Sequence, residues 1–260
     1  VKQAINIVLA HGQYISGPEV KKLETELAKH SGAKHAVGCS SGTDALVLPL
    51  MALGVGPGDA VFVPSFTFAA TAEAVALVGA TPVFVDCLAA TYNMDPKSLE
   101  AAIDMIKKEG KLRSIGVTAV GLLGQPADFA KIDVIAAKHG LWTMEDAAQS
   151  YGASLGNRRV GTLAKVTTTS FFPAKPLGCY GDGGAMFTDD DNIAEILRSL
   201  LVHGKGTDKY DNVRIGMNGR LDTMQAAVLL EKMKIFDEEI ELRDKVYKRY
   251  NAGLKGVAGV

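Results

Sequence analysis

Residues 35–63 read HAVGCSSGTDALVLPLMALGVGPGDAVFV, which places two short apolar runs on either side of a helical stretch. We expect strands at residues 35–39 and 60–63, and between them a helix at 42–53 that begins at a Ser-Ser-Gly-Thr turn. The same order recurs further along the chain, with expected helices at 68–78, 96–108 and 129–139 and expected strands at 81–85, 114–120 and 141–145. This alternation predicts an α/β fold with a mostly parallel, mixed sheet that carries helices on both faces.

The second half of the chain has a different character. We expect β structure at 166–172 and 185–188, a helix at 192–202, a polar loop at 204–219 and one long charged helix from 222 to about 250. Residues 1–17 are expected to form an N-terminal arm that begins as a helix. Both ends look cut, so we expect residues 1–250 to be one large domain and 251–260 the start of a truncated small C-terminal domain.

Composition excludes several classes of protein. The 260 residues hold 28 basic and 29 acidic side chains, so the sequence predicts neither a nucleic-acid partner nor a membrane-surface partner, both of which need a basic excess. No apolar run approaches the ~20 residues of a membrane span. Cys39, Cys87 and Cys179 have no metal-ligand spacing, which indicates free thiols, no metal site and a reducing compartment, the cytoplasm.

Three segments have the composition of a binding site. Ser40-Ser41-Gly42-Thr43-Asp44 lies between an expected strand and an expected helix, where free backbone N–H groups can bind an anion such as a phosphate. Asp146 lies at the carboxyl end of a strand, where open α/β sheets bind ligands. Lys175 stands between two prolines and before a glycine-rich loop, a setting in which a lysine can act as an amine nucleophile.

Each segment also has a simpler interpretation. A serine or threonine at a helix start can be an N-cap without a ligand, Asp146 can cap the following turn, and Lys175 can be a solvated loop side chain. Taken together, however, a phosphate cradle, an acid and a constrained lysine are the groups that hold pyridoxal phosphate. In such a site the lysine forms a Schiff base, the acid keeps the ring nitrogen protonated and the cradle holds the phosphate.

Seven segments in order resemble the DegT/StrS family of nucleotide-sugar aminotransferases, which are fold type I pyridoxal-phosphate enzymes. They are GQYISGPEV at 12–20, SGTDAL at 41–46, PSFTF at 64–68, GQPAD at 124–128, EDAAQ at 145–149, the run around Lys175, and NGRLD at 218–222. The resemblance implies that fold and a site shared across a homodimer. It matches Lys175 to the Schiff-base lysine and Asp146 to the partner of the ring nitrogen.

The resemblance also implies roles for residues around the ring and the phosphate. Phe68 matches the aromatic residue that stacks on the ring, and Gln149 matches a residue beside it, although Phe68 could be plain core and Gln149 a turn amide. Gly42, Thr43 and Ser170 match phosphate contacts, and Asn218 matches a residue that reaches the phosphate of the neighbouring subunit. Arg220 and His203 are candidates for substrate anions, or else surface or dimer contacts.

The run FFPAKPLGCYGDGGA, residues 171–185, is most similar to enzymes that aminate carbon 3 of a UDP-linked 2-acetamido uronic acid with glutamate as donor, for O-antigen or related surface polysaccharides. Three alternatives remain open on the sequence. One is a carbon-4 aminotransferase, which shares most of these motifs. Another is a dehydratase relative, in which a histidine would replace Lys175. The third is a non-catalytic regulator or scaffold, which would tolerate loss of Lys175 or Asp146.

Overall fold

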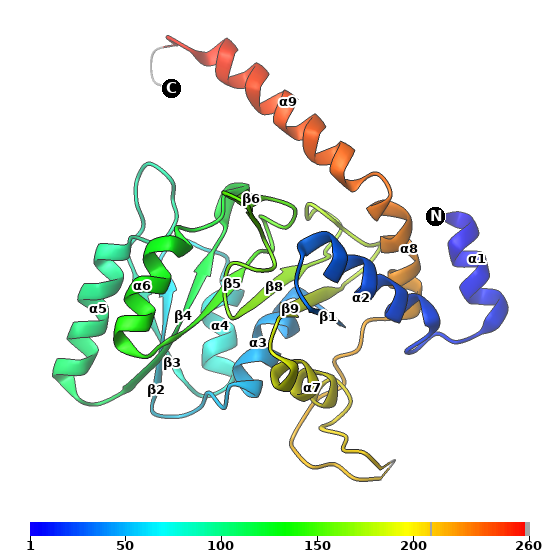
Figure 1. Ribbon diagram of the computed structural model, residues 1–260, viewed down its shortest axis with the longest axis horizontal. Helices are drawn as coiled ribbons and strands as arrows, with labels where there is room; N and C mark the ends of the chain where they lie inside the picture. The colour runs from blue at the N-terminus through cyan, green and yellow to red at the C-terminus, as the bar shows by residue number, and fades with distance from the viewer. Residues whose placement is uncertain (209, 258–260) are drawn as a thin grey trace.

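The computed structural model describes residues 1–208 and 210–257 and is built around a seven-stranded sheet (Figure 1). The strand order is β1 (His35–Cys39), β9 (Gly184–Thr188), β8 (Val166–Ser170), β5 (Trp142–Asp146), β4 (Arg113–Val120), β2 (Asp59–Pro64) and β3 (Thr81–Val85). Strands β8, β5, β4, β2 and β3 pair in parallel, whereas β9 runs antiparallel to both β8 and β1. The predicted mostly parallel, mixed sheet is therefore confirmed.

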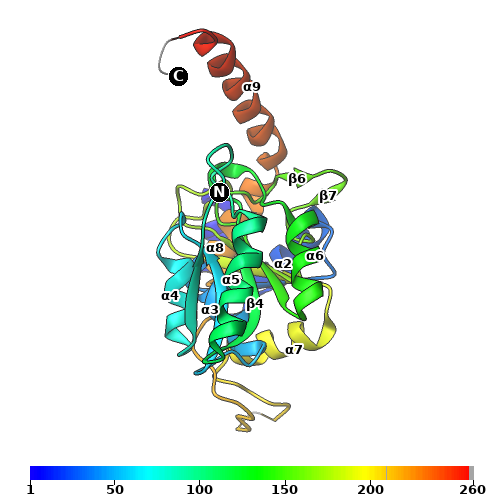
Figure 2. The same ribbon diagram turned by 90° about the vertical axis from the view of Figure 1, so that its left-hand side faces the viewer.

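Helices cover both faces of this sheet, as Figures 1 and 2 show from two sides. One face packs against α2 (Pro18–Ser31), α5 (Pro96–Glu109), α6 (Phe129–His139) and α8 (Thr223–Met233), and the other against α3 (Gly42–Ala52), α4 (Ala70–Leu77) and α7 (Asp191–Leu200). Each face has its own hydrophobic core, the first under α2, α5, α6 and α8 and the second under α3, α4 and α7. Strand β2 contributes to both, since Phe62 lies in the first core while Val61 and Val63 lie in the second. Alternating residues on one strand point to opposite faces, so a continuous apolar run fits a sheet that is covered twice.

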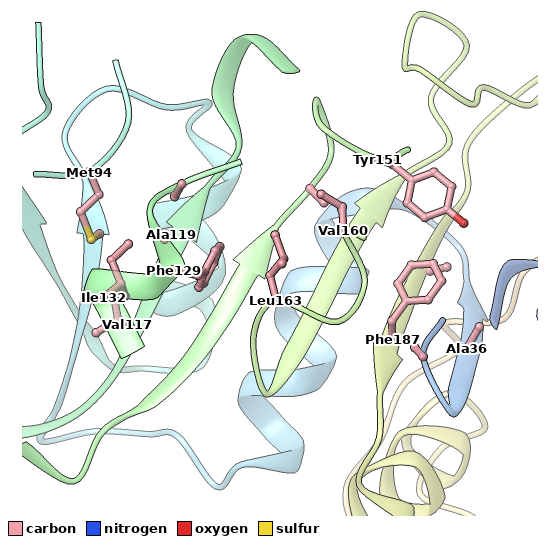
Figure 3. Close-up of a cluster of buried hydrophobic side chains, with 14 of the residues drawn as sticks. Ala36, Met94, Val117, Ala119, Phe129, Ile132, Tyr151, Val160, Leu163 and Phe187 are labelled. Carbon is pink, nitrogen blue, oxygen red and sulfur yellow. The ribbon is translucent and has the colours of Figure 1, made fainter. Parts of the chain in front are cut away.

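Aromatic side chains link the C-terminal helices to the first core. The rings of Tyr151 and Phe187, seen in Figure 3, lie 5.4 Å apart, and the ring of Phe236 lies 5.7 Å from that of Tyr151. Phe236 is 1% exposed and begins α9 (Phe236–Leu254). This anchor fixes the point from which α9 leaves the body of the molecule (Figure 1).

The prediction of one long terminal helix is wrong. Residues 223–254 form two helices, α8 and α9, because Ile235 between them has φ −117° and ψ 4°, which is not helical. Phe236, directly after this interruption, packs in the first core. Helix α9 runs through residue 250, and the expected domain division there stays a prediction; residues 258–260 lie outside the described part of the chain.

Smaller differences lie close to the candidate site. Helix α4 begins at Ala70 and not at residue 68, which leaves Phe68 in the preceding turn, and β8 ends at Ser170 and not at residue 172. The arm begins with α1 (Lys2–His11), as expected. A small hairpin, β6 (Ser154–Leu155) with β7 (Arg158–Arg159), and the 3₁₀ turn η1 (Leu122–Gly124) were not expected. Within the two described ranges, every helix is too short or too polar to cross a membrane.

Candidate active site

The three predicted segments meet at the carboxyl edge of the parallel strands. Asp146 is the last residue of β5, and it lies in register with Thr168 on β8, which ends two residues later at Ser170. Helix α3 begins at Gly42, next to Ser170. This edge is where open α/β sheets bind their ligands, so the topology brings the candidate residues together.

The start of α3 forms a cradle with the end of β8. A Cβ atom added to Gly42 would lie 2.6 Å from Cβ and 2.8 Å from Oγ of Ser170, so only glycine allows this close approach. Ser41 is the N-cap, and its Oγ accepts a hydrogen bond of 3.0 Å from the N–H of Asp44. The N-cap interpretation is thus correct, yet the N–H groups of Gly42 and Thr43 belong to the first turn, which has no carbonyl partners within the helix and suits an anion.

Asp146 is 5% exposed, and both of its carboxylate oxygens accept hydrogen bonds. Oδ1 accepts from the N–H of Ala148 at 3.1 Å, so Asp146 does cap the following turn. Oδ2 accepts from Oγ1 of Thr71, on α4, at 2.9 Å. Burial raises the pKa of Asp146, while the two hydrogen bonds and the positive charge of Lys175 act in the opposite direction. A carboxylate held in this way can meet a buried cationic group.

Lys175 lies in the turn after β8, with its N–H donating to the carbonyl of Phe172 at 2.9 Å. The residue is half-buried, and its Nζ donates to Oε1 of Gln149 at 3.1 Å. Lys175 is therefore not a freely solvated loop side chain, and Gln149, in the turn after β5, contacts the amine. Through Lys175, the segments at residues 145–149 and 173–178 form one site.

Phe68 is 74% exposed, so the interpretation of Phe68 as plain core is wrong. It lies one turn before the buried Thr71, whose hydroxyl contacts Asp146. A ligand or partner that covered this phenyl ring would remove its apolar surface from water, which is favourable. Its position fits a role in contacting a flat ligand.

Asn218 and Arg220 lie beside the cradle. The N–H of Ser40 donates to the carbonyl of Gly219 at 2.9 Å, which brings this segment next to the start of the cradle in the same chain. Nε and Nη2 of Arg220 donate to Oδ1 of Asn218 at 3.1 and 2.7 Å. His203 lies in the turn that opens the loop, with φ 57°, and its N–H donates to the carbonyl of Met217 at 3.0 Å.

The sequence analysis missed two residues of this site, Thr67 and Thr71. Their hydroxyl oxygens lie 3.0 Å apart, and Thr71 contacts Asp146. The available signal was a pair of threonines four residues apart on either side of an expected helix start, in the segment TFAAT at residues 67–71. Thr67 precedes α4, which begins at Ala70, so the turn before the helix brings the two hydroxyls together, and the sequence does not show which group they meet.

The donor set fits pyridoxal phosphate. Asp146 can pair with a protonated ring nitrogen, Lys175 can bond to the aldehyde carbon, and the start of α3 with Ser170 can hold the phosphate. In the described ranges, no group of three or more His, Cys, Asp or Glu side chains is arranged to hold a metal ion. The chemistry that this arrangement supports is carbonyl and amine chemistry on an organic cofactor.

Comparison with known proteins identifies the family. The sequence profile of the DegT/DnrJ/EryC1/StrS aminotransferase family matches residues 1–260. A relative from Pseudomonas aeruginosa, UDP-2-acetamido-2-deoxy-3-oxo-D-glucuronate aminotransferase, is 53% identical over 257 residues, which are 99% of this chain and 69% of that protein.

Solved structures agree with the sequence match. A DegT DnrJ EryC1 StrS aminotransferase from Brucella abortus superposes with a TM-score of 0.97 at 56% identity, over 98% of this chain and 69% of that one. NtdA from Bacillus subtilis, solved with bound cofactor PMP, gives a TM-score of 0.88 at 32% identity, over 98% of this chain and 57% of that one.

Proposed function

The chain belongs to the DegT/DnrJ/EryC1/StrS family of pyridoxal-phosphate-dependent sugar aminotransferases, and from this premise we propose that it transfers an amino group from glutamate to carbon 3 of a UDP-linked 2-acetamido-3-keto uronic acid. The observation that carries the proposal is the joining of Lys175, Asp146 and the start of α3 at one sheet edge, in a chain 53% identical to an aminotransferase for such a 3-oxo sugar.

Each residue of the site has a part in this reaction. Lys175 would hold the cofactor covalently and then move a proton with its freed amine. Asp146 would keep the ring nitrogen protonated, because a carboxylate favours the charged form of a neighbouring base. Gly42, Thr43 and Ser170 would bind the phosphate, while Phe68 and Gln149 would contact the ring. When bound, pyridoxal phosphate supplies an electron sink that makes the proton on the amine-bearing carbon easier to remove.

The alternatives are less well supported. Amination at carbon 3 is favoured over carbon 4 because the P. aeruginosa relative acts on a 3-oxo sugar. A dehydratase would carry a histidine at the position of Lys175. A non-catalytic regulator would have no use for a buried, hydrogen-bonded Asp146 facing a constrained lysine, and this chain keeps both.

The proposal includes assembly as a homodimer in which each site uses residues from both chains. The loop at 204–219 supports it, because this loop extends from the body of the molecule (Figure 1) and carries Ile215, which is 88% exposed, and the exposed Asn218. In the dimer, Asn218 would reach the neighbouring subunit's phosphate. His203, and Arg220 beside Asn218, would contact the sugar diphosphate or uronate. A large apolar side chain this exposed is suited to a protein contact.

We place the enzyme in the cytoplasm, in the synthesis of precursors for O-antigen or a related surface polysaccharide. Its free thiols, of which Cys39 and Cys179 are buried, suit a reducing compartment. The proposal also divides the chain at residue 250, with residues 1–250 as the cofactor domain and 251–260 as the start of a small domain. Exposed Val246, Tyr250 and Leu254 on α9 support a further contact there.

The test is a panel of keto-nucleotide sugars, assayed with glutamate on the protein expressed at its natural length. We expect amination of the 3-keto uronate to exceed that of 4-keto hexoses, with 2-oxoglutarate formed in equal amount to the amino sugar. Release of 2-oxoglutarate without any sugar product, or a preference for a 4-keto substrate, would contradict the substrate assignment.

Lys175→Ala is the matched control in the same assay. Because a partly buried turn lysine contributes little to the core, we expect a folded protein with an unchanged circular dichroism spectrum. It should lack the visible absorbance band of covalently held cofactor and should not aminate any sugar. Turnover at the parent rate in this variant would remove Lys175 from the mechanism.

A further inference from the structure

Two hydrogen-bonded hydroxyl groups, those of Thr67 and Thr71, connect the half-buried turn before α4 to the buried carboxylate of Asp146. Oγ1 of Thr67 lies 3.0 Å from Oγ1 of Thr71, which in turn lies 2.9 Å from Oδ2 of Asp146. Thr71 is 1% exposed and Asp146 is 5% exposed, so water does not compete freely for these contacts. The other carboxylate oxygen, Oδ1, is satisfied by the N–H of Ala148.

The chemistry of the groups fixes the direction of these hydrogen bonds. An ionised carboxylate can only accept hydrogen bonds, so Thr71 must give its one hydroxyl proton to Asp146. Its oxygen then acts as an acceptor, and the proton between the two threonines must come from Thr67. Donation in this direction polarises both hydroxyls toward the carboxylate and is strongest when Asp146 carries its charge.

We infer that Thr71, backed by Thr67, is a positioning residue that keeps the Asp146 carboxylate ionised and pointed into the site. This inference rests on the proposed function only for the identity of the ring nitrogen that Asp146 would face. The two hydroxyls and their contact with Asp146 belong to α4, the turn before it and β5, and do not depend on a bound cofactor. Thr71 acts through Asp146 and makes no contact with the cofactor in this scheme.

The neighbouring charges do not account for the ionised form on their own. Burial is the largest influence on Asp146 and raises its pKa, while Ala148, Thr71 and Lys175 lower it. Glu145, the preceding residue on β5, points to the opposite face of the sheet and is itself shifted toward its neutral form by burial. Thr71 is therefore the side-chain hydrogen bond that opposes the burial of Asp146.

The test uses Thr71→Val, which keeps the shape and removes the hydroxyl, together with Thr71→Ser, which keeps the hydroxyl. The first readout is the titration of the Asp146 carboxyl carbon by NMR in cofactor-free protein. We expect Thr71→Val to raise the pKa of Asp146 by about one unit or more, because hydrogen bonds to charged groups are among the stronger ones. Thr71→Ser should restore the parent value, and Thr67→Val should give a smaller shift of the same sign.

A second readout uses enzyme loaded with pyridoxal phosphate. In Thr71→Val, kcat should fall severalfold with little change in KM, and the fall should become smaller as the pH rises and Asp146 ionises more fully. The matched control is Thr188→Val. Thr188 is buried and its hydroxyl bonds to the carbonyl of Lys165 at 2.9 Å, but it lies at the opposite edge of the sheet.

Two outcomes separate this inference from the proposed function. An unchanged Asp146 pKa in a folded Thr71→Val protein would overturn the inference, whether or not the enzyme is active. A shifted pKa in a protein that never binds pyridoxal phosphate would overturn the proposed function and support the hydrogen-bond role. Equal shifts in Thr71→Val and Thr188→Val would also overturn the inference, because the effect would then follow from any lost buried hydroxyl.

Discussion

Glu145 and Asp146 are adjacent acids that occupy opposite faces of the same strand. Asp146 points toward α4, where Thr71 donates to it, and Glu145 points toward the core on the other face. Glu145 is fully buried, and its Oε2 accepts from Oγ1 of Thr167 at 2.9 Å, while Oε1 is buried without a hydrogen bond. The hydrogen bonds to Asp146 thus favour its ionised form, whereas the surroundings of Glu145 favour its neutral form.

Asp146→Asn keeps the shape of the side chain and removes its charge. Without that charge the ring nitrogen loses the partner that keeps it protonated, so turnover should fall by on the order of a hundredfold or more, while cofactor still binds. Single-turnover kinetics and the absorbance of bound cofactor measure the two effects separately. Asp104→Asn, an exposed change on α5, is the control. Undiminished turnover in Asp146→Asn would show that Asp146 only caps its turn.

Glu145→Gln should stabilise the protein at high pH. Burial raises the pKa of Glu145 from 4.5 to about 7, so between these values the folded protein binds more protons than the unfolded chain. The free energy of unfolding therefore falls as the pH rises through this range, and the loss is complete above pH ~7. The glutamine variant escapes this loss and should be more stable at pH ~8 by on the order of 1–3 kcal/mol.

Urea unfolding at acidic and alkaline pH measures this difference. Near pH ~4.5 Glu145 is protonated in the folded protein and is therefore as neutral as a glutamine at this position. The glutamine variant should have no advantage there. Glu109→Gln, at an exposed site on α5, should leave the pH dependence as it is. An identical stability profile for the parent and Glu145→Gln would mean that Glu145 stays ionised in the core.

At the scale of elements, the sequence predicted the strands and most helices, because the spacing of apolar residues within a segment indicates which of its faces is buried. The predictions fail where a contact between residues far apart in the sequence determines the local structure. The break between α8 and α9 depends on Phe236 reaching the ring of Tyr151, 85 residues earlier in the chain. Nothing local in a charged helical segment signals that contact, so one continuous helix was the natural expectation.

The same distinction applies to the site. Lys175, Asp146 and the start of α3 were found because their types and settings are unusual within short segments, although the roles assigned to them remain predictions. The contact of Thr71 with Asp146 was not found, because the two residues are 75 positions apart and meet only when α4 docks on β5. Buried hydroxyls of threonine are common, and their partners are decided by tertiary packing.

The approach of α3 to β8 gives a prediction for one pair of elements. Gly42→Ala would place a Cβ 2.6 Å from that of Ser170, so the start of α3 must move away from the cradle. We expect a loss of stability of about 1–3 kcal/mol from overpacking and at least tenfold weaker binding of pyridoxal phosphate. Adding Ser170→Gly should recover stability, because it removes the opposing Cβ.

Thermal unfolding and cofactor titration measure these two quantities. Binding should recover less than stability in the double variant, since Ser170 is also a proposed phosphate contact. Gly54→Ala is an unsuitable control because its φ is +70°, whereas Gly253→Ala, in open space on α9, tests a harmless added methyl group. If Gly42→Ala binds cofactor and unfolds like the parent, α3 does not depend on this close approach.

At the scale of the whole molecule, two features extend from the body in Figure 1, the loop at 204–219 and helix α9. The loop returns to the body at Asn218 and Arg220, next to the cradle. Since Arg220 can only donate, it holds Oδ1 of Asn218 and leaves the amide NH₂ to point elsewhere, as a donor suited to a phosphate oxygen. Whether that phosphate belongs to the same chain or to a partner is decided by assembly.

The shared-site proposal predicts that two damaged chains restore each other. Lys175→Ala and the double variant Asn218→Ala, Arg220→Ala should each be inactive or nearly so. In a mixed C₂ dimer one site receives both damaged parts, while the other combines an intact Lys175 with an intact Asn218 and Arg220. Activity should therefore rise after subunit exchange, toward one working site per mixed dimer.

Exchange is followed with differently tagged chains, and two batches of Lys175→Ala serve as the control mixture. An interface of this kind buries more than ~2,000 Å². A monomer that still binds cofactor tightly, or mixing without recovery despite proven exchange, would mean that the loop serves its own chain.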